Sequence, residues 1–116
     1  MKLIRRLATG IATVCLLASL TFSAHSEENR RVRIINRASS SIRYLYASNV
    51  DRRTWEEDLL GPFAVLLPDH YVDVNIDDGT GHCRYDLRAV LSDGREAVTS
   101  NFNVCAEPSW TVTDGN

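Results

Sequence analysis

From about residue 30 onward, apolar and polar residues of this chain alternate with a period of two. Ile42, Tyr44 and Tyr46 share one parity, and the odd positions of 83–91 are Cys, Tyr, Leu, Ala and Leu. Such alternation is typical of strands that bury one face and expose the other. No stretch of similar length shows a sustained helical period. We predict strands at 31–36, 41–47, 63–67, 71–77, 83–91, 96–104 and 109–113.

Turn-forming residues separate these segments. Short strands at this spacing predict an all-β fold, namely a small antiparallel β-sandwich of about seven strands, Ig-like or of a similar Greek-key type. The turn signals lie at Ala38-Ser39-Ser40, Gly61-Pro62, Pro68-Asp69, Asp77-Asp78-Gly79-Thr80-Gly81 and Asp93-Gly94.

Asp93-Gly94 predicts a hairpin with a two-residue loop, because a type I′ turn needs positive φ at both central positions. In that register Leu91 faces Glu96 and Cys83 faces Val104, so that apolar residues gather on one side.

The first 26 residues have the organisation of a secretory signal peptide. A positively charged start is followed by an apolar stretch over 7–22 and by small residues at Ala24 and Ser26. The apolar stretch is too short and too lightly flanked for a permanent membrane span. We therefore expect residues 1–26 to be removed and residues 27–116 to form a single domain that is periplasmic or secreted.

Removal of this segment would leave ten arginines, no lysine and fifteen acidic residues, a net charge of −5. An excess of negative charge argues against non-specific binding to nucleic acids or to anionic membranes. A core of this size is marginal and benefits from a covalent crosslink.

Cys83 and Cys105 are the two cysteines outside the predicted signal peptide. In an oxidising compartment such a pair most often forms a structural disulfide, which contributes about 3 kcal/mol. Cys105 falls one residue beyond the position opposite Cys83, so a bulge or a relaxed strand end is needed. The alternative, a metal site with His82, falls short of the four ligands of a closed zinc site.

Residues 27–116 contain no catalytic signature. They lack the nucleophile elbow of serine hydrolases, the paired histidines of zinc proteases and a glycine-rich phosphate loop. Only His70 and His82 remain as histidines, and short loops leave little room for a cleft. We expect no enzyme, no catalytic residue and no cofactor.

Arg84, Asp86 and Arg88 fall on the outer face of one predicted strand. They form either a charged recognition stripe that binds a partner's carboxylates, or a solvated face with weak cross-strand ion pairs. We favour the second interpretation. A third is that Asp86 holds a loop by accepting backbone N–H bonds.

Trp55 lies in the polar segment 49–58, which ends at Asp58. The tryptophan either plugs one end of the sandwich or is exposed for a partner. Plugging is favoured because a small core needs its large side chains, and the same applies to Trp110.

The acidic turn that contains Asp77 and Asp78 offers carboxylate oxygens to a calcium ion, to which Asp58 and Asp86 could add ligands. Its spacing is not that of an EF-hand, and an aspartate-glycine cluster between strands is usually a turn. We favour turn chemistry over a metal site.

The motifs W-x-x-D-L-L-G from Trp55 to Gly61 and D-D-G-x-G-x-C-x-Y-D-L-R-A from Asp77 to Ala89 give this chain a resemblance to a group of small, exported, uncharacterised bacterial proteins. The resemblance covers nearly the whole predicted mature chain but implies no activity. Some similar sequences carry the label argininosuccinate lyase. That enzyme is a far longer helical protein, and a small β-domain cannot form its shared active site.

Two hypotheses on function follow. The first is an exported, non-enzymatic binding or interaction module that engages an envelope protein or ligand. The alternative is a small metal- or ligand-binding domain centred on Asp77 to Asp86.

Overall fold

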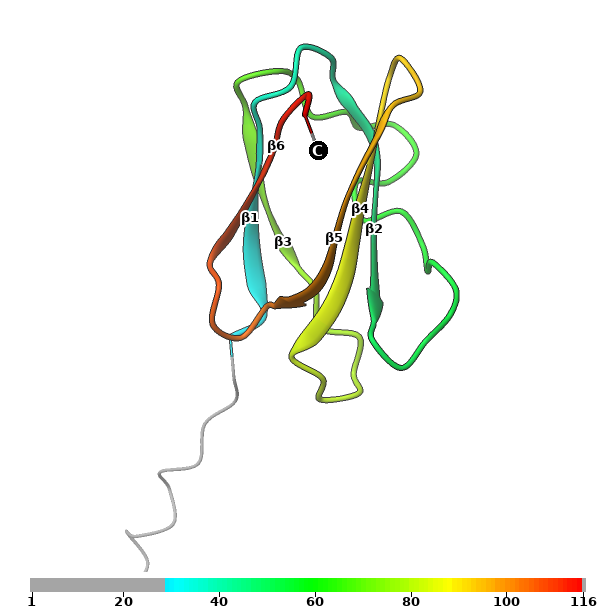
Figure 1. The fold of residues 1–116 in the computed structure, drawn as a ribbon, viewed down its shortest axis with the longest axis vertical. Coiled ribbons are helices and arrows are strands. Elements are labelled where there is room, and N and C mark those ends of the chain that lie inside the picture. Colours follow the sequence, from blue (N-terminus) through cyan, green and yellow to red (C-terminus); the bar gives the residue numbers. More distant parts are fainter. Residues whose placement is uncertain (1–28, 116) are drawn as a thin grey trace, which may run out of the picture.

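The computed structural model describes residues 29–115, so the predicted signal peptide lies outside the described residues. Two three-stranded sheets, β3-β1-β6 and β2-β4-β5, face each other in this part of the chain (Figure 1). The predicted all-β sandwich is confirmed. No helix in the described range is long and apolar enough to cross a membrane. The strands are β1 (Arg31–Asn36), β2 (Ile42–Asn49), β3 (Tyr71–Asn75), β4 (Arg84–Leu91), β5 (Glu96–Asn103) and β6 (Ser109–Val112).

The predicted strand at 63–67 is wrong. Only Leu66 pairs there, in an isolated bridge in which Ile42 and Leu66 exchange backbone hydrogen bonds of 2.8 and 2.9 Å. Phe63 is 99% exposed, and Leu66 is the only buried residue of 63–67. The segment therefore lacks the alternating buried face that would hold it as a strand. A second difference from the predicted antiparallel sandwich is that β6 pairs with β1 in parallel. The pairs β1–β3, β2–β4 and β4–β5 are antiparallel.

The core lies between the two sheets and is built from the inward side chains of all six strands. Tyr85, Leu87 and Ala89 of β4 point inward while their neighbours face outward, as alternation requires. Trp110 belongs to this core, as predicted. Its other large members include Val32, Ile34, Ile42, Leu45, Leu66, Phe102, Val104 and Val112.

The hairpin between β4 and β5 turns through three residues, not two. The N–H of Leu91 donates to the carbonyl of Arg95 at 2.8 Å, and the N–H of Gly94 donates to the carbonyl of Leu91 at 2.9 Å. Gly94 has φ 92° while Asp93 is not in the positive-φ region, whereas a type I′ turn would need both. Leu91 therefore faces Arg95, and the predicted pairing with Glu96 is wrong.

A bulge in β5 restores the predicted register further along the hairpin. Tyr85 pairs with Phe102 because two residues of β5, Ser100 and Asn101, lie opposite Asp86. The one-residue shift introduced at the turn is thereby cancelled before the hairpin reaches the cysteines.

Candidate functional site

The predicted cysteine pair lies at the far end of this hairpin. The sulfur atoms of Cys83 and Cys105 are 2.05 Å apart, at bonding distance, and their Cα atoms are 5.3 Å apart. The N–H of Val104 still donates to the carbonyl of Cys83 at 2.8 Å, and a turn then begins in which the N–H of Ala106 donates to the carbonyl of Asn103. This relaxed strand end is one of the two solutions that the spacing required.

Asp58 fixes the loop between β2 and β3. Its carboxylate accepts the backbone N–H groups of Leu45 at 2.9 Å and Leu60 at 3.1 Å. The N–H of Leu59 donates in turn to the carbonyl of Leu45 at 2.8 Å. The loop is therefore held against the outer edge of β2, and these contacts give Asp58 a positioning role.

The same loop places Trp55 on the outer face of the sheet β2-β4-β5. The ring of Trp55 is 6.5 Å from that of Tyr46, which is 6.2 Å from Tyr44 with an angle of 19° between the two tyrosine planes. The guanidinium carbon of Arg88 lies 5.4 Å from the ring of Tyr46 and 5.7 Å from that of Trp55. We call these four residues the aromatic–arginine surface. The interpretation that Trp55 plugs one end of the sandwich is wrong.

Arg88 is fixed in this surface by Glu96. Its Nε and Nη2 atoms donate to the two carboxylate oxygens at 2.9 and 3.1 Å. These hydrogen bonds raise the pKa of Arg88 and lower the pKa of Glu96 from their ordinary values. A bidentate pair defines the plane of the guanidinium as well as its position. The guanidinium thus stays beside the rings of Tyr46 and Trp55. Trp55 remains 36% exposed, and Tyr44, which stacks on Tyr46, remains 38% exposed.

The other two members of the predicted stripe bind the bulge in β5. Asp86 accepts the N–H of Asn101 at 2.9 Å, and Arg84 donates to the carbonyl of the same residue at 3.2 Å. The stripe therefore divides: Arg84 and Asp86 hold the backbone, whereas Arg88 alone joins Trp55.

Tyr44 and Tyr46 were not predicted as surface residues. A shift in the pairing of β2 with β4 between Ile42 and Tyr44 changes the parity of β2. Ile42 and Leu45 are buried as a result, and the two tyrosines face outward. The alternation of 42–46 contained no signal for this shift, because tyrosine fits either face.

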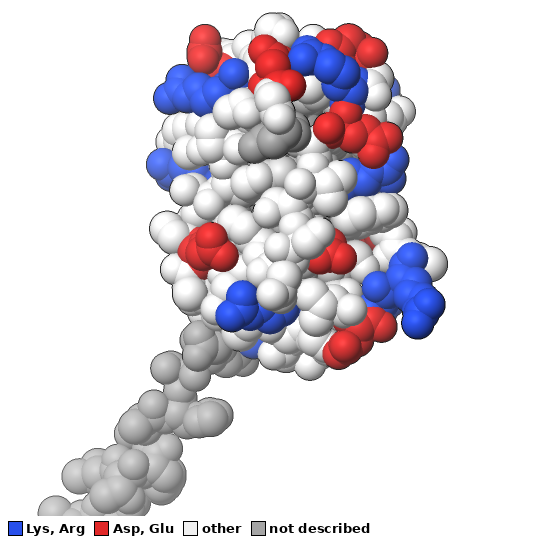
Figure 2. Space-filling view, viewed as in Figure 1, with Lys and Arg blue, Asp and Glu red and all other residues white. Residues whose placement is uncertain are grey.

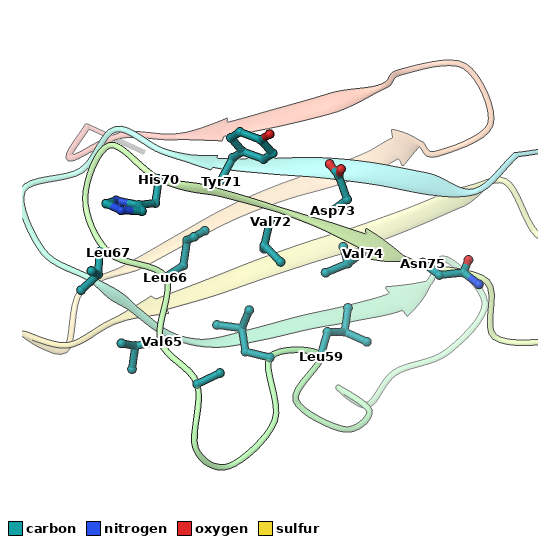
Figure 3. A pocket seen from close by; sticks show the side chains of 12 residues that line it. Leu59, Val65, Leu66, Leu67, His70, Tyr71, Val72, Asp73, Val74 and Asn75 are labelled. Carbon is teal, nitrogen blue, oxygen red and sulfur yellow. The ribbon is translucent and has the colours of Figure 1, made fainter.

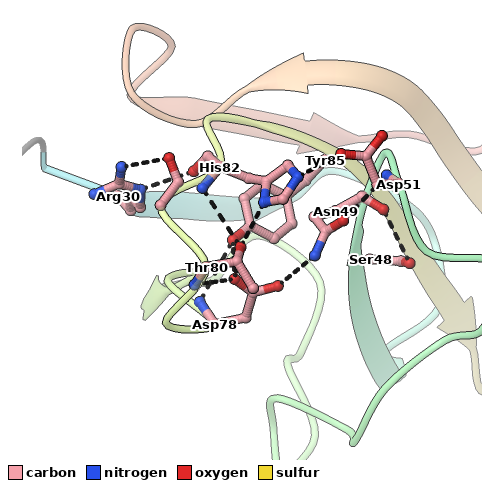
Figure 4. A network of polar contacts seen from close by, with 9 residues as sticks. Arg30, Ser48, Asn49, Asp51, Asp78, Thr80, His82 and Tyr85 are labelled. Atoms are coloured by element: carbon pink, nitrogen blue, oxygen red, sulfur yellow. Dashed lines mark hydrogen bonds and ion pairs between the residues drawn. The ribbon is translucent and has the colours of Figure 1, made fainter.

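The acidic turn is tied to β2 and β4 by polar contacts (Figure 4). The carboxylate of Asp78 accepts the hydroxyl of Tyr85 and the Nδ2 of Asn49, both at 2.8 Å, and the N–H and hydroxyl of Thr80. Burial raises the pKa of Asp78, but the bonds from Thr80, Asn49 and Tyr85 outweigh it and hold the pKa well below its ordinary value. Burial, and then the bond to Asp78, raise the pKa of Tyr85.

His82 extends this network to two other segments (Figure 4). Its Nδ1 is 2.6 Å from the hydroxyl of Thr80, and its Nε2 is 2.7 Å from a carboxylate oxygen of Asp51. Arg30, just before β1, donates to the carbonyls of His82 at 2.8 Å and Gly81 at 3.1 Å. The network joins the acidic turn to the beginning of β1 and to the loop after β2.

The carboxylates of the acidic turn are occupied by donors from the protein itself. Asp77 accepts the N–H of Gly79 at 3.0 Å, while Asp78 accepts the bonds described above. Within residues 29–115, no three His, Cys, Asp or Glu side chains come together as a metal site would require. Asp58 and Asp86, the additional ligands considered, bind backbone N–H groups elsewhere in the fold.

An apolar groove of about 560 Å³ runs along the outer edge of β3 (Figure 3). Consecutive residues 71–75 line one side, and 59–60 with 64–67 line the other. The second side is fixed at Leu66, whose carbonyl accepts the N–H of Ile42 at 2.8 Å and the Nδ2 of the buried Asn36 at 2.9 Å.

Charged side chains of both signs are interspersed on the face shown in Figure 2. Within residues 29–115, five arginines form ion pairs with carboxylates, namely Arg33, Arg37, Arg52, Arg88 and Arg95. Figure 2 shows no broad basic area on this face.

Comparison with known proteins finds no family model, no curated protein and no solved structure that matches this chain. A functional proposal must therefore rest on the geometry and chemistry of the surfaces described above.

Proposed function

We propose that this chain is an exported, non-enzymatic binding module that holds a partner protein through the aromatic–arginine surface. The observation that carries the proposal is the exposure of Trp55 and Tyr44, at 36% and 38%, in one cluster with Arg88. Tryptophan, tyrosine and arginine are the residue types that contribute most of the binding energy in protein interfaces. Their concentration on one sheet face is typical of an interface centre.

The surface is organised before any partner binds. Tyr44 and Tyr46 project from a hydrogen-bonded strand, and Arg88 is held by Glu96. Rings and guanidinium therefore lose little conformational entropy on association. A partner would supply apolar atoms to the ring faces and an oxygen acceptor to the outer N–H groups of Arg88.

Export is the part of the proposal that rests on the sequence. Residues 1–26 have the three regions of a signal peptide, and the sulfur atoms of Cys83 and Cys105 lie at bonding distance. A disulfide persists in the periplasm or outside the cell and is rare in the reducing cytosol. We therefore expect the partner to be an envelope or extracellular protein.

Affinity recovery from native cells tests the proposal. The tagged, exported protein and its Trp55→Ala variant are recovered from envelope fractions together with what they bind. The control is Phe63→Ala, which removes a fully exposed ring outside the aromatic–arginine surface. Melting temperatures establish that all three proteins are folded.

We expect the parent and the Phe63→Ala variant to recover the same partner. Recovery by the Trp55→Ala variant should fall by at least about tenfold, since truncating a central interface residue commonly costs about 2 kcal/mol or more. Equal recovery by the folded Trp55→Ala variant would overturn the proposal.

A further inference from the structure

β3 is an edge strand whose outer backbone groups face the apolar groove. The N–H of Ile76 donates to the carbonyl of Arg30, and the N–H of Asn36 donates to the carbonyl of His70, both at 2.9 Å. In an antiparallel pair the residues that bond the neighbouring strand alternate, so even-numbered residues of this strand bond β1. The backbone groups that point away from β1 are those of Tyr71, Asp73 and Asn75.

The groove has the shape that an added strand requires. Because consecutive residues 71–75 line it, it runs along the edge of β3 and not over one face. Val72 and Val74 point into the groove, toward the side formed by Leu59 and Leu66 (Figure 3). A strand about 4.8 Å from β3 would meet the three positions that have no backbone partner within residues 29–115, and its alternate side chains would enter this apolar space.

We propose that this groove binds an extended polypeptide segment of a partner protein, which adds a fourth strand to the sheet β3-β1-β6. Strand addition takes its affinity from backbone hydrogen bonds and its specificity from the pockets that receive alternate side chains. The groove shares no lining residue with the aromatic–arginine surface, so the inference does not depend on the proposed function.

The outward backbone groups of β3 favour a polypeptide as the occupant of the groove. Tyr71, Asp73 and Asn75 present an N–H and a carbonyl at every second residue, and a peptide backbone has the same repeat. A lipid chain or a small apolar molecule would fill the groove but leave these groups without partners, which is costly once water is excluded.

Charge argues against a second copy of this chain as the occupant. Two copies of β3 could also pair with each other in an antiparallel arrangement. In only one register would Tyr71, Asp73 and Asn75 of both copies all form backbone hydrogen bonds, and that register places Asp73 opposite Asp73 of the second copy. Like charges directly opposite each other destabilise a strand pair, an effect that the bidentate bonds from Arg33 to Asp73 at 2.8 and 3.1 Å reduce but do not remove. A charged residue in the middle of an edge strand is also a common protection against edge-to-edge association.

The test uses a synthetic peptide of alternating valine and threonine, with a lysine at each end and blocked termini, added to the exported protein. Amide hydrogen exchange is followed by NMR. We expect exchange at Tyr71, Asp73 and Asn75 to slow at least about tenfold when the peptide is saturating. Exchange at Val72 and Val74, whose N–H groups already bond β1, should not change.

Two N-methylated peptides distinguish strand addition from apolar contact. One carries N-methyl groups on the threonines and the other on the valines. In an extended peptide the N–H groups of alternate residues point to opposite edges, so each methylated peptide can donate hydrogen bonds from one edge only. Strand addition predicts that one of these peptides binds and the other does not. Equal binding of both, or binding without slower exchange at the three amides, would overturn the inference.

Variants of Asp73 test whether the backbone N–H at position 73 of β3 is needed for peptide binding. Asp73→Pro removes an N–H that faces the groove, a change that edge strands tolerate, whereas Asp73→Ala keeps it. We expect peptide binding to be lost in the first variant and retained in the second. If the Asp73→Pro variant does not fold, the two N-methylated peptides still distinguish strand addition from apolar contact.

Sedimentation without peptide supplies the remaining control. A concentration-dependent dimer with slow exchange at the same three amides would identify a second copy as the occupant and contradict the inference.

Discussion

The carboxylate of Asp86 accepts the backbone N–H of Asn101 at 2.9 Å. Asn101 has φ 56°, a left-handed conformation that asparagine adopts more readily than most residues. The bond therefore fixes the bulge at which β5 gains its extra residue. That bulge places Tyr85 opposite Phe102 and sets the register in which the hairpin reaches the cysteines.

Replacing Asp86 with alanine should lower the free energy of unfolding by about 1–3 kcal/mol, because a hydrogen bond to a charged group is lost at a strained position. Asn101→Gly is the matched control, since glycine keeps the positive φ and the N–H. Urea unfolding at neutral pH measures both variants. An Asp86→Ala variant as stable as the parent would show that the bulge does not need this bond.

The pair Cys83–Cys105 should contain no free thiol in the protein isolated without reductant. Labelling under denaturing, non-reducing conditions is the direct measurement. Replacing both cysteines with serine should lower the stability by about 3 kcal/mol, the chain-entropy value for a loop of this size. Stoichiometric labelling of both cysteines before reduction would refute the bridge.

Stability should fall in acid because carboxylates in this fold have lowered pKa values. A carboxylate with a depressed pKa stabilises the folded state above its ordinary pKa, and this contribution is lost as the pH falls toward the folded-state value. The hydrogen bonds to the carboxylate of Asp78 outweigh the effect of burial and lower its pKa. The hydrogen bond from Arg95 lowers the pKa of Asp93 to about 2. We expect the urea midpoint to be nearly constant from about pH 7 to 5 and to fall from about pH 4 downward.

The Tyr85→Phe variant distinguishes the contribution of Asp78 to the pH dependence of stability from that of the other carboxylates. The variant lacks the hydroxyl that donates to Asp78, so it should lose about 1 kcal/mol at neutral pH. Its loss of stability in acid should be smaller than that of the parent. An unchanged pH dependence would show that this bond does not lower the pKa of Asp78.

Calcium should not change the melting temperature, because the turn carboxylates bind donors of the protein itself. A cation that binds only the folded state would raise the melting temperature at millimolar concentration. Asp77→Asn should be nearly neutral, since asparagine can still accept the N–H of Gly79. Asp78→Asn should cost about 1–3 kcal/mol, because hydrogen bonds to a charged carboxylate are replaced. A calcium-dependent rise in the parent that both variants abolish would establish a metal site instead.

Alternation predicted the strands well where the pleat is uninterrupted. In β4 the inward positions are Tyr85, Leu87 and Ala89, as the pattern requires. In β2 the same reasoning failed, because the pairing shift near Ile42 reverses the parity. Apolar periodicity reports which residues prefer burial but does not reveal where a backbone adds a residue.

Long-range contacts explain what else the sequence did not determine. Trp55 lies outside the core because Asp58, three residues later, binds the backbone of Leu45 on β2. Nothing in the composition of the loop specifies that contact. The role of Asp86 as an acceptor of a backbone N–H was among the sequence interpretations, and the contact with Asn101 is of that kind.

Site-specific photo-crosslinking in living cells tests the binding role of the aromatic–arginine surface most directly. Val98 is 49% exposed and pairs with Arg88, so a benzophenone amino acid at position 98 probes the surface while Tyr44, Tyr46, Trp55 and Arg88 stay intact. Position 111, on the outer face of the other sheet, is the control. We expect a discrete crosslinked partner from position 98, none from position 111, and loss of the product when Trp55→Ala is added. Equal crosslinking from both positions, or a product that persists with Trp55→Ala, would contradict the account.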